Sequence, residues 1–521
     1  ITASAGTSNV RFGVNAGNSI ASGGNYNVVV GDEAGTAITT GDYNTFMGYQ
    51  AGDATTEAVY NVAIGGASLS TNVLGSKSVA VGTSALFIQN PASAVDMFNT
   101  AVGHEAGAAV TTGVQNTLIG GLAGDALTDA DNNVAIGTLA LSTETNNNGN
   151  TAVGAEALKV QNAGGGNDAR NTAVGFAAGT AVTTGIQNTL MGGLAGDALT
   201  DSDRNTAVGF QALTADTLGQ YSTAMGYFAL GSQNFTSGTD AYNTAIGYVA
   251  GASVTTGIQN TLIGALAGDA ITDADFNTAV GYQSLSNNVL GSKNVALGYS
   301  TLASMNPASA SNTFNTAVGH AAGQVVTTGV QNTLIGGLAG DALTTGGSNV
   351  AVGYGSLSTE DAHGGNTAIG ASTLAVLNAG ANAFNTAVGF NSGVSVTTGT
   401  NNTFVGALCG DGTNDGESNV AMGYAALSAN CGDSNVAVGL NALTGCTNSN
   451  NTAVGTAAGD NVTSGTQNTL IGAQVEAEAA GSNNCIALGF NVVAGAGFTT
   501  VGIDANDIRA QHGVATWATV S

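Results

Sequence analysis

A five-residue phrase recurs along the chain and limits what the chain can fold into more than any other feature. The phrase is Asn-Thr/Val-x-Val/Ile-Gly, and its closing glycine occurs 28 times between Gly13 and Gly489. Consecutive closing glycines mostly follow one another at a period of about 17 residues, but through the first two-thirds of the chain every fourth step is longer, at about 21 residues. Four repeats therefore form a longer unit of about 72 residues, as Asn27, Asn99 and Asn171 show, and this unit shortens toward the C-terminus.

This period indicates a stack of short coils. A repeat of about 17 residues is too short for helical hairpins or propeller blades. Inside the phrase the residues alternate as in a strand, and Gly, Asn, Asp and Thr fill the remainder as in turns. We predict an all-β fold, a parallel β-solenoid or β-roll of about 28 coils of about 16–21 residues each. Coils stacked about 4.8 Å apart would place each residue type over its own copy and form a rod of roughly 130 Å.

The two ends of the chain depart from this pattern. Arg11 interrupts an alanine-rich column in the first coil, and the phrase is lost after Gly489. Because an uncovered coil offers a free strand edge, we expect special structure at both ends. The predicted segments are an N-terminal cap or junction with the first coil at 1–26, a solenoid shaft at 27–490, and a C-terminal cap or junction at 491–521.

Two positions of the phrase predict local structure: the first residue predicts a pattern of hydrogen bonds, and the closing glycine predicts a backbone conformation. The first position is Asn in 25 of 28 repeats, the exceptions being Ser78, Ser222 and Cys485. Stacked amides can hydrogen-bond to one another and to turn backbone, so we predict an asparagine ladder, with a plain turn preference as the alternative. The closing glycine predicts a corner that needs positive φ or a close backbone approach.

The third position of the phrase suggests a contact face. We expect the second and fourth residues to point into the coil and the third to point outward, although the third is alanine in most repeats. In one repeat of every four it is large, which predicts a subunit contact in which these side chains lock the register of neighbouring chains. The alternative is that the third position forms an internal core. The large residues are Phe46, Leu118, Leu190, Leu262, Leu334, Phe404 and Leu470.

The repeats resemble known families. Asn-Val-Ala-Ile-Gly at 61–65 and 133–137, with Ser-Val-Ala-Val-Gly at 78–82, is similar to the head repeats of trimeric autotransporter adhesins. That resemblance implies a left-handed parallel β-roll in a bundle of three chains. The longer phrase Asn-Thr-Ala-Val-Gly-x-x-Ala-Gly-x-x-Val-Thr-Thr-Gly-x-x-Asn-Thr resembles tail-fibre and virion structural proteins of phages, particularly those of marine cyanobacteria, over about residues 9–490.

Composition and motifs exclude several classes of function. With 7 basic and 33 acidic residues, the formal net charge of −26 disfavours nucleic acid and anionic membranes as partners. No apolar run reaches the roughly 18 residues of a membrane span, so no membrane insertion is predicted. The chain lacks Gly-x-Ser-x-Gly, His-Glu-x-x-His and Gly-x-Gly-x-x-Gly, and we predict that it is not an enzyme and has no catalytic or cofactor-binding residue.

Acidic and sulfur-bearing residues supply weaker candidates. Three Asp pairs on one loop type are close enough to share a calcium ion, although solvated surface acids are the alternative. These pairs are Asp129 with Asp131, Asp201 with Asp203, and Asp273 with Asp275. No other cofactor is predicted. Cys431 and Cys446 occupy nearly the same place in adjacent coils, which suits either a disulfide or small buried side chains.

Aromatic residues directly after the closing glycine are candidates for receptor contact, because exposed rings can stack on sugars. We single out Tyr227, Tyr248, Tyr282 and Tyr299. The alternative is that these rings cover neighbouring coils at a corner.

Together these observations predict a structural fibre protein. The expected molecule is a rigid homotrimeric rod of a phage tail fibre or virion appendage, extracellular on the virion, which carries or forms a host-surface contact. Its expected partners are its own copies, other virion or fibre proteins at its ends, and a host glycan or protein. A bacterial trimeric surface adhesin head is the alternative, and a polysaccharide depolymerase is a third hypothesis.

Overall fold

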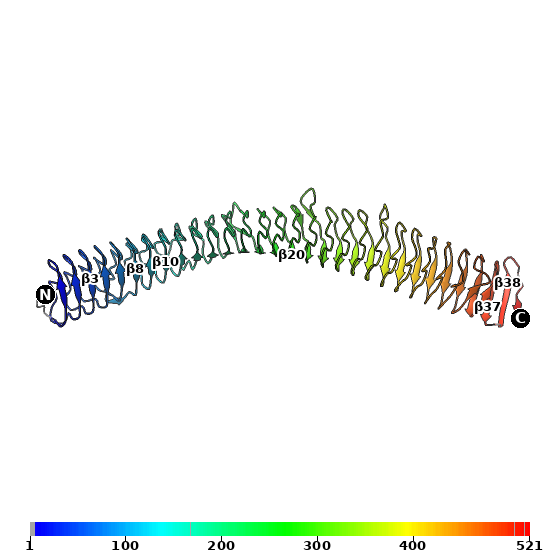
Figure 1. Ribbon diagram of the computed structural model, residues 1–521, viewed down its shortest axis with the longest axis horizontal. Coiled ribbons are helices and arrows are strands. Elements are labelled where there is room, and N and C mark those ends of the chain that lie inside the picture. The colour runs from blue at the N-terminus through cyan, green and yellow to red at the C-terminus, as the bar shows by residue number, and fades with distance from the viewer. Residues whose placement is uncertain (1–5, 167, 505, 515, 521) are drawn as a thin grey trace. The chain divides into compact units, whose positions relative to one another are not determined.

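The computed structural model describes residues 6–166, 168–504, 506–514 and 516–520. The protein is an all-β parallel β-solenoid of about 29 turns, which confirms the predicted fold class (Figure 1). The described residues form no helix, and so none that could cross a membrane. The coils divide into two compact units, Ile1–Asn260 and Thr261–Ser521.

Each coil of the first unit contributes one short strand to a parallel ladder. The strands pair in register, so that Thr100, Ala101 and Val102 lie beside Thr117, Leu118 and Ile119 of the next coil. The ladder strands are β1 (Val10–Phe12), β2 (Val28–Val30), β3 (Thr45–Met47), β4 (Val62–Ile64), β6 (Val79–Val81), β8 (Thr100–Val102), β9 (Thr117–Ile119), β10 (Val134–Ile136), β11 (Thr151–Val153), β12 (Thr172–Val174), β13 (Thr189–Met191), β14 (Thr206–Val208), β16 (Thr223–Met225) and β18 (Thr244–Ile246).

The second unit repeats this arrangement. Its ladder strands are β19 (Thr261–Ile263), β20 (Thr278–Val280), β22 (Val295–Leu297), β24 (Thr316–Val318), β25 (Thr333–Ile335), β26 (Val350–Val352), β27 (Thr367–Ile369), β28 (Thr386–Val388), β29 (Thr403–Val405), β30 (Val420–Met422), β31 (Val436–Val438), β32 (Thr452–Val454), β33 (Thr469–Ile471) and β35 (Ile486–Phe490). β37 (Phe498–Ile503) pairs in parallel with β35, after which β38 (Asn506–Gln511) and β39 (Ala518–Val520) are antiparallel. The coil pattern therefore ends within residues 491–521.

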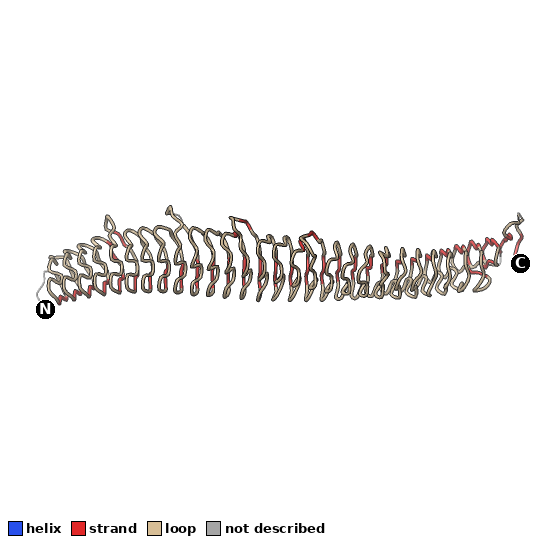
Figure 2. Tube along the Cα trace, turned by 90° about the horizontal axis from the view of Figure 1, so that it is seen from above, coloured by secondary structure: helices blue, strands red, loops and turns tan. Residues whose placement is uncertain are grey.

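The longer coils carry loops that leave the regular turn path (Figure 2). Outside the main ladder, four pairs of two-residue strands connect neighbouring coils, and the two strands of each pair are parallel. They are β5 (Gly75–Ser76) with β7 (Val95–Asp96), β15 (Gly219–Gln220) with β17 (Thr239–Asp240), β21 (Gly291–Ser292) with β23 (Ser311–Asn312), and β34 (Glu476–Ala477) with β36 (Val493–Ala494).

The closing glycines form the predicted corner. Gly120 has a φ of +138°, a conformation that side-chain-bearing residues rarely adopt. A Cβ on Gly120 would lie 2.5 Å from the carbonyl oxygen of Gly137, the equivalent residue of the next coil. Glycine is required here because each corner rests directly on the backbone of the next.

The asparagine ladder is also confirmed. The backbone N–H of Asn116 donates to Oδ1 of Asn99 at 2.9 Å, and Oδ1 of Asn116 accepts from the N–H of Asn133 at 2.9 Å. Nδ2 of Asn116 donates to the carbonyl of Ala130 at 2.7 Å. Most of the buried amides thus satisfy a backbone donor and a backbone acceptor in the following coil, with Nδ2 of Asn150 an exception among the described residues. This pattern accounts for asparagine better than a plain turn preference does.

The orientation expected for the phrase is wrong. The third-position side chains point into the coil, and none of the seven large ones has any exposed surface within the single chain: Phe46, Leu118, Leu190, Leu262, Leu334, Phe404 and Leu470. A side chain with no exposed area cannot contact a second chain. These residues are therefore the internal core of each coil rather than a subunit contact face, and the second and fourth positions point outward.

Volume compensation explains why the large residue recurs in every fourth coil. A Cβ on Gly107 would lie 2.6 Å from Cδ1 of Leu118, and one on Gly124 would lie 2.8 Å from Cδ2. The other two coils of the four carry a buried leucine where these glycines stand, as at Leu141 and Leu158. The narrow interior thus accepts either the large third-position residue between two glycines or an alanine beside a leucine.

Candidate interaction surface

The outward side of the strand ladder carries a repeated apolar surface in each unit. We call this surface the ladder face and define it by the second and fourth positions of the phrase and the residues that flank the phrase. In β13, Leu190 is buried, Thr189 is half-buried and Met191 is 43% exposed. The fourth-position residues exposed in this way are Met47, Ile119, Met191, Met225, Leu297, Ile335, Ile369, Met422, Val454 and Ile471.

Aromatic residues line the edge of the ladder face that follows the closing glycine. The exposed members are Tyr49, Phe176, Phe210, Tyr227, Tyr248, Tyr282, Tyr299, Tyr354, Phe390, Tyr424 and Phe490. They flank a strip of Thr, Val, Ile and Met, so aromatic and aliphatic surface is continuous in the coils that carry such a ring.

The four tyrosines singled out from the sequence are exposed but stacked on one another along the coils. The ring of Tyr227 lies between Phe210 and Tyr248, with centroid distances of 6.0 and 5.4 Å. Tyr299 lies between Tyr282 and His320 at 5.6 and 5.1 Å. Because sugars stack on ring faces, the two central rings offer only their edges to a receptor, which favours the alternative that they cover neighbouring coils.

The opposite edge, formed by the residue before each Asn, carries aromatic and basic residues among Gln, Asn, Ser and Gly. The rings of Tyr26, Tyr43 and Tyr60 stack at 4.8 and 5.0 Å. Four of the seven basic residues of the chain occupy this column: Lys77, Arg170, Arg204 and Lys293. Sequence reasoning missed this column, although a large residue before the recurring Asn was the available signal.

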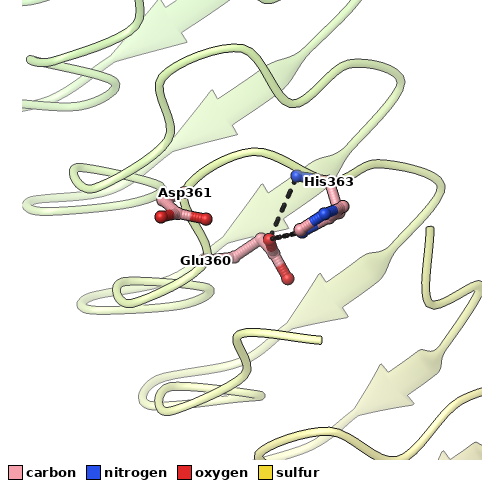
Figure 3. A group of neighbouring side chains, drawn as sticks. All are labelled: Glu360, Asp361 and His363. Carbon is pink, nitrogen blue, oxygen red and sulfur yellow. Dashed lines mark hydrogen bonds and ion pairs between the residues drawn. The ribbon is translucent and has the colours of Figure 1, made fainter. Parts of the chain in front are cut away.

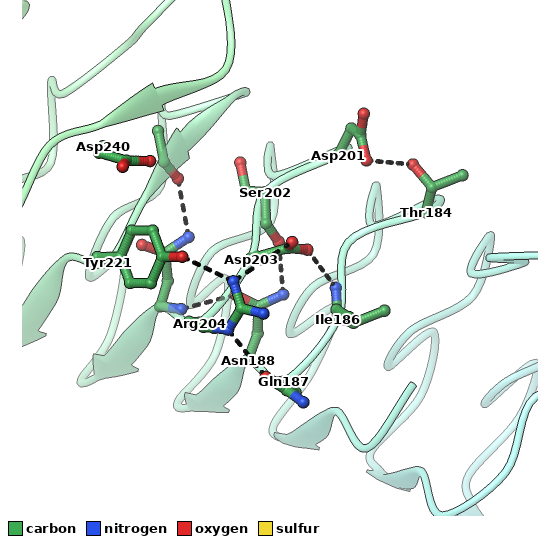
Figure 4. A network of polar contacts seen from close by, with 12 residues as sticks. Thr184, Ile186, Gln187, Asn188, Asp201, Ser202, Asp203, Arg204, Tyr221 and Asp240 are labelled. Atoms are coloured by element: carbon green, nitrogen blue, oxygen red, sulfur yellow. Dashed lines mark hydrogen bonds and ion pairs between the residues drawn. The ribbon is translucent and has the colours of Figure 1, made fainter. Parts of the chain in front are cut away.

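Arg204 shows how these cations are held (Figure 4). Its Nη1 donates to the hydroxyl of Tyr221 at 2.7 Å, and its Nε donates to Oε1 of Gln187 at 3.0 Å. The guanidinium also lies 5.4 Å from the centroid of the Tyr221 ring. Lys293 similarly lies over the rings of Phe276 and Phe314, at 5.9 and 5.3 Å. Residues of the coils above and below therefore hold Arg204 and Lys293, whereas Lys77 pairs with Asp96 at 2.6 Å and Arg170 with Asp168 at 2.5 Å.

Acidic residues avoid the ladder face. Asp32 is the only acidic residue among the described second, fourth and flanking positions, although the chain contains 33 acids. The others lie on the turns, but some of these stand directly beside the basic edge, where Asp96 pairs with Lys77 at 2.6 Å and Asp168 pairs with Arg170 at 2.5 Å. The ladder face itself is thus apolar and nearly free of acidic side chains, while Lys77 and Arg170 at its edge are paired with acids of the same chain.

The Asp pairs proposed for calcium have other partners. Oδ1 of Asp131 accepts from the backbone N–H of Val114 at 2.8 Å, and Oδ1 of Asp203 accepts from that of Ile186 at 2.9 Å. Asp129, Asp201 and Asp273 each accept from a threonine hydroxyl. The backbone N–H of Asp275 donates to Ser292. Among the described residues, no pair belongs to a group of three His, Cys, Asp or Glu side chains.

A second acidic set is partly buried. Asp53, Asp125, Asp269 and Asp341 stand at equivalent places, and Oδ1 of each is buried with no hydrogen-bond partner among the described residues. Burial raises the pKa of each carboxyl, and the nearby Glu105 raises that of Asp125 further. The cause is the loss of hydration of the charged form.

All four cysteines are buried free thiols, including Cys431 and Cys446, so the structure has no bridge between them. Burial raises the pKa of Cys409 to about 12, and those of Cys431 and Cys485 to about 11. These thiols act as small core side chains.

One group of side chains in the described residues has metal-ligand character. Glu360, Asp361 and His363 lie on one turn and offer ligand atoms within 4.8 Å of one another (Figure 3). The sequence analysis did not single out any of these three residues.

Comparison with known proteins adds no family. The chain matches no protein-family model, and a search of curated proteins finds no relative. No pocket is found within the described residues. The class of protein is defined by its fold, a parallel β-solenoid, and the candidate site is the ladder face.

Proposed function

We propose that the chain is the shaft of a structural fibre, in which three copies pack through their ladder faces. The observation that carries this proposal is the aliphatic strip of the ladder face, which recurs in coil after coil and is nearly free of acids. Exposed apolar surface of this extent on a soluble protein is typical of an interface.

The area available supports a stable assembly. A coil rises about 4.8 Å, and the residues from one flanking column to the other span roughly 20 Å, which corresponds to roughly 100 Å² per coil. About eight coils therefore reach the roughly 800 Å² per partner of an ordinary stable interface. Each unit contains more coils than this.

Charge favours the same face. With a formal net charge of −26, two chains repel one another wherever their acidic turns meet. The ladder face can approach a second copy without that repulsion.

The biological setting rests on the resemblance of the repeats to phage fibre proteins. We propose that the fibre belongs to a phage tail or another virion appendage, joins other virion proteins at its ends, and carries or forms a host-surface contact. The number of three chains rests on the same resemblance. Imaging of particles labelled with an antibody against the chain tests this placement, and label away from the virion would overturn it.

The interface is tested by placing charge on the ladder face. Ile119→Asp combined with Met191→Asp adds two buried charges per chain at the proposed contact, whereas the matched control Thr112→Asp with Thr256→Asp adds them on exposed turns. By light scattering we expect the wild type and the control at three times 50.4 kDa and the first variant at 50.4 kDa. An unchanged mass for the first variant contradicts the proposal.

A further inference from the structure

We propose that Glu360, Asp361 and His363 form a binding site for a divalent transition-metal ion such as Zn²⁺. The three residues lie in the turn that follows β26, and a single short segment therefore supplies one imidazole and two carboxylates (Figure 3). This inference goes beyond the proposed fibre function and does not depend on it.

The carboxylate at the centre of the group is fully buried. Glu360 has no exposed side-chain surface; its Oε1 accepts from the backbone N–H of His363 at 3.1 Å and lies 3.1 Å from Nδ1 of the same residue. Among the described residues, its Oε2 has one long contact, 3.4 Å, with the N–H of Ala379. A buried carboxylate with one weakly satisfied oxygen is stabilised by a nearby cation.

In an equivalent turn of another coil, the buried carboxylate has different hydrogen-bond partners. Asp216 stands where Glu360 does, and its Oδ1 accepts from the N–H of Gly219 while its Oδ2 accepts from Nε2 of Gln233 at 2.6 Å. In the turn of Glu360, the residue equivalent to Gln233 is Leu377, which has no donor, and the residue equivalent to Gly219 is His363. The turn has therefore lost an amide donor and gained an imidazole.

The donor set selects the kind of ion. A neutral imidazole nitrogen with carboxylate oxygens suits Zn²⁺ and its first-row neighbours, whereas calcium prefers oxygen ligands alone. Asp361 is exposed and His363 is 24% exposed, so the ion can enter from solvent. Small side-chain rotations are enough to bring ligand atoms that lie within 4.8 Å of one another onto one ion.

The test is a titration of the full chain with Zn²⁺, followed calorimetrically. We expect one ion per chain and an affinity at least tenfold weaker in His363→Asn. We expect this variant to fold, because another coil already has asparagine at the equivalent position: Nδ2 of Asn147 donates to Oε1 of Glu144 at 2.8 Å. Folding of His363→Asn is checked by circular dichroism.

Two controls complete the test. His320→Asn removes a histidine that stacks on Tyr299, away from this group, and should leave Zn²⁺ binding unchanged. Calcium at the same concentration should not compete. Absence of binding in the wild type, or equal binding in His363→Asn, overturns the proposal and leaves the group as a hydrogen-bonded turn with an ion pair.

Discussion

Single residues in this protein act through copies of themselves in neighbouring coils. Asn99, Asn116 and Asn133 form one continuous set of hydrogen bonds, and each closing glycine rests on the next. A substitution at one coil therefore disturbs the coil beside it as well. A residue cannot be replaced without loss of stability at positions such as these, where its backbone and its side chain, or the lack of one, both contact the next coil.

Gly120→Ala should destabilise the solenoid by at least about 2 kcal/mol, because the new Cβ meets the Gly137 carbonyl and φ is strained. The adjacent Gly121 provides a matched control, since a Cβ there meets no atom within 4 Å. Gly121→Ala should be nearly neutral in chemical denaturation. Equal midpoints for the two variants would contradict the role assigned to the corner.

The buried carboxyl of Asp125 predicts a dependence on pH. Its pKa is raised in the folded state, chiefly by desolvation, so its unfavourable contribution is absent below the ordinary Asp pKa of about 3.9 and develops as pH rises through the folded pKa. Asp125→Asn should therefore raise the free energy of unfolding at pH 7 but not at about pH 3.5. Asp129→Asn, on an exposed side chain, should have little effect at either pH. A benefit of Asp125→Asn that persists in acid would refute this explanation.

At the scale of the element, each coil is a narrow tube with room for one large side chain near its strand. The sequence predicted the strands, the register, the glycine corner and the asparagine ladder, because all four follow from the period and from residue type. It did not predict which side of the strand faces inward. Alternation separates Ala101 from Thr100 and Val102, but all three positions accept apolar residues, and alternation alone does not assign the interior.

The missing information was the coupling between distant positions. Leu118 is large where Gly107 and Gly124 are small, and this relation recurs around Leu190, Leu334 and Phe404. If this relation between a large residue and two glycines is interpreted as volume compensation, the third position must lie inside the coil. The second and fourth positions could then have been assigned to the ladder face from the sequence. The function of that face requires a binding experiment.

Core volume can be tested in both directions. Leu118→Ala leaves a cavity between two glycines and should cost about 2–5 kcal/mol, and Ala135→Leu overfills a coil that already holds Leu141 and should cost about 1–3 kcal/mol. Thermal and denaturant unfolding measure both effects. If Leu118→Ala left unfolding unchanged and altered only the mass of the assembly, Leu118 would belong to an interface after all.

At the scale of the whole molecule, two sides of the coil have opposite chemistry. One side carries aliphatic, aromatic and basic residues, and the turns carry nearly all of the 33 acids. A chain arranged in this way can remain soluble only if the apolar side is covered or binds a partner. The proposed packing of identical chains would cover it.

A cross-section of the purified protein by electron cryomicroscopy tests this account most directly. We predict three solenoids in section, with the ladder strands and Ile119 and Met191 turned toward the common axis and the acidic turns outside. A single solenoid in section, or several with their ladder faces turned to solvent, would contradict it.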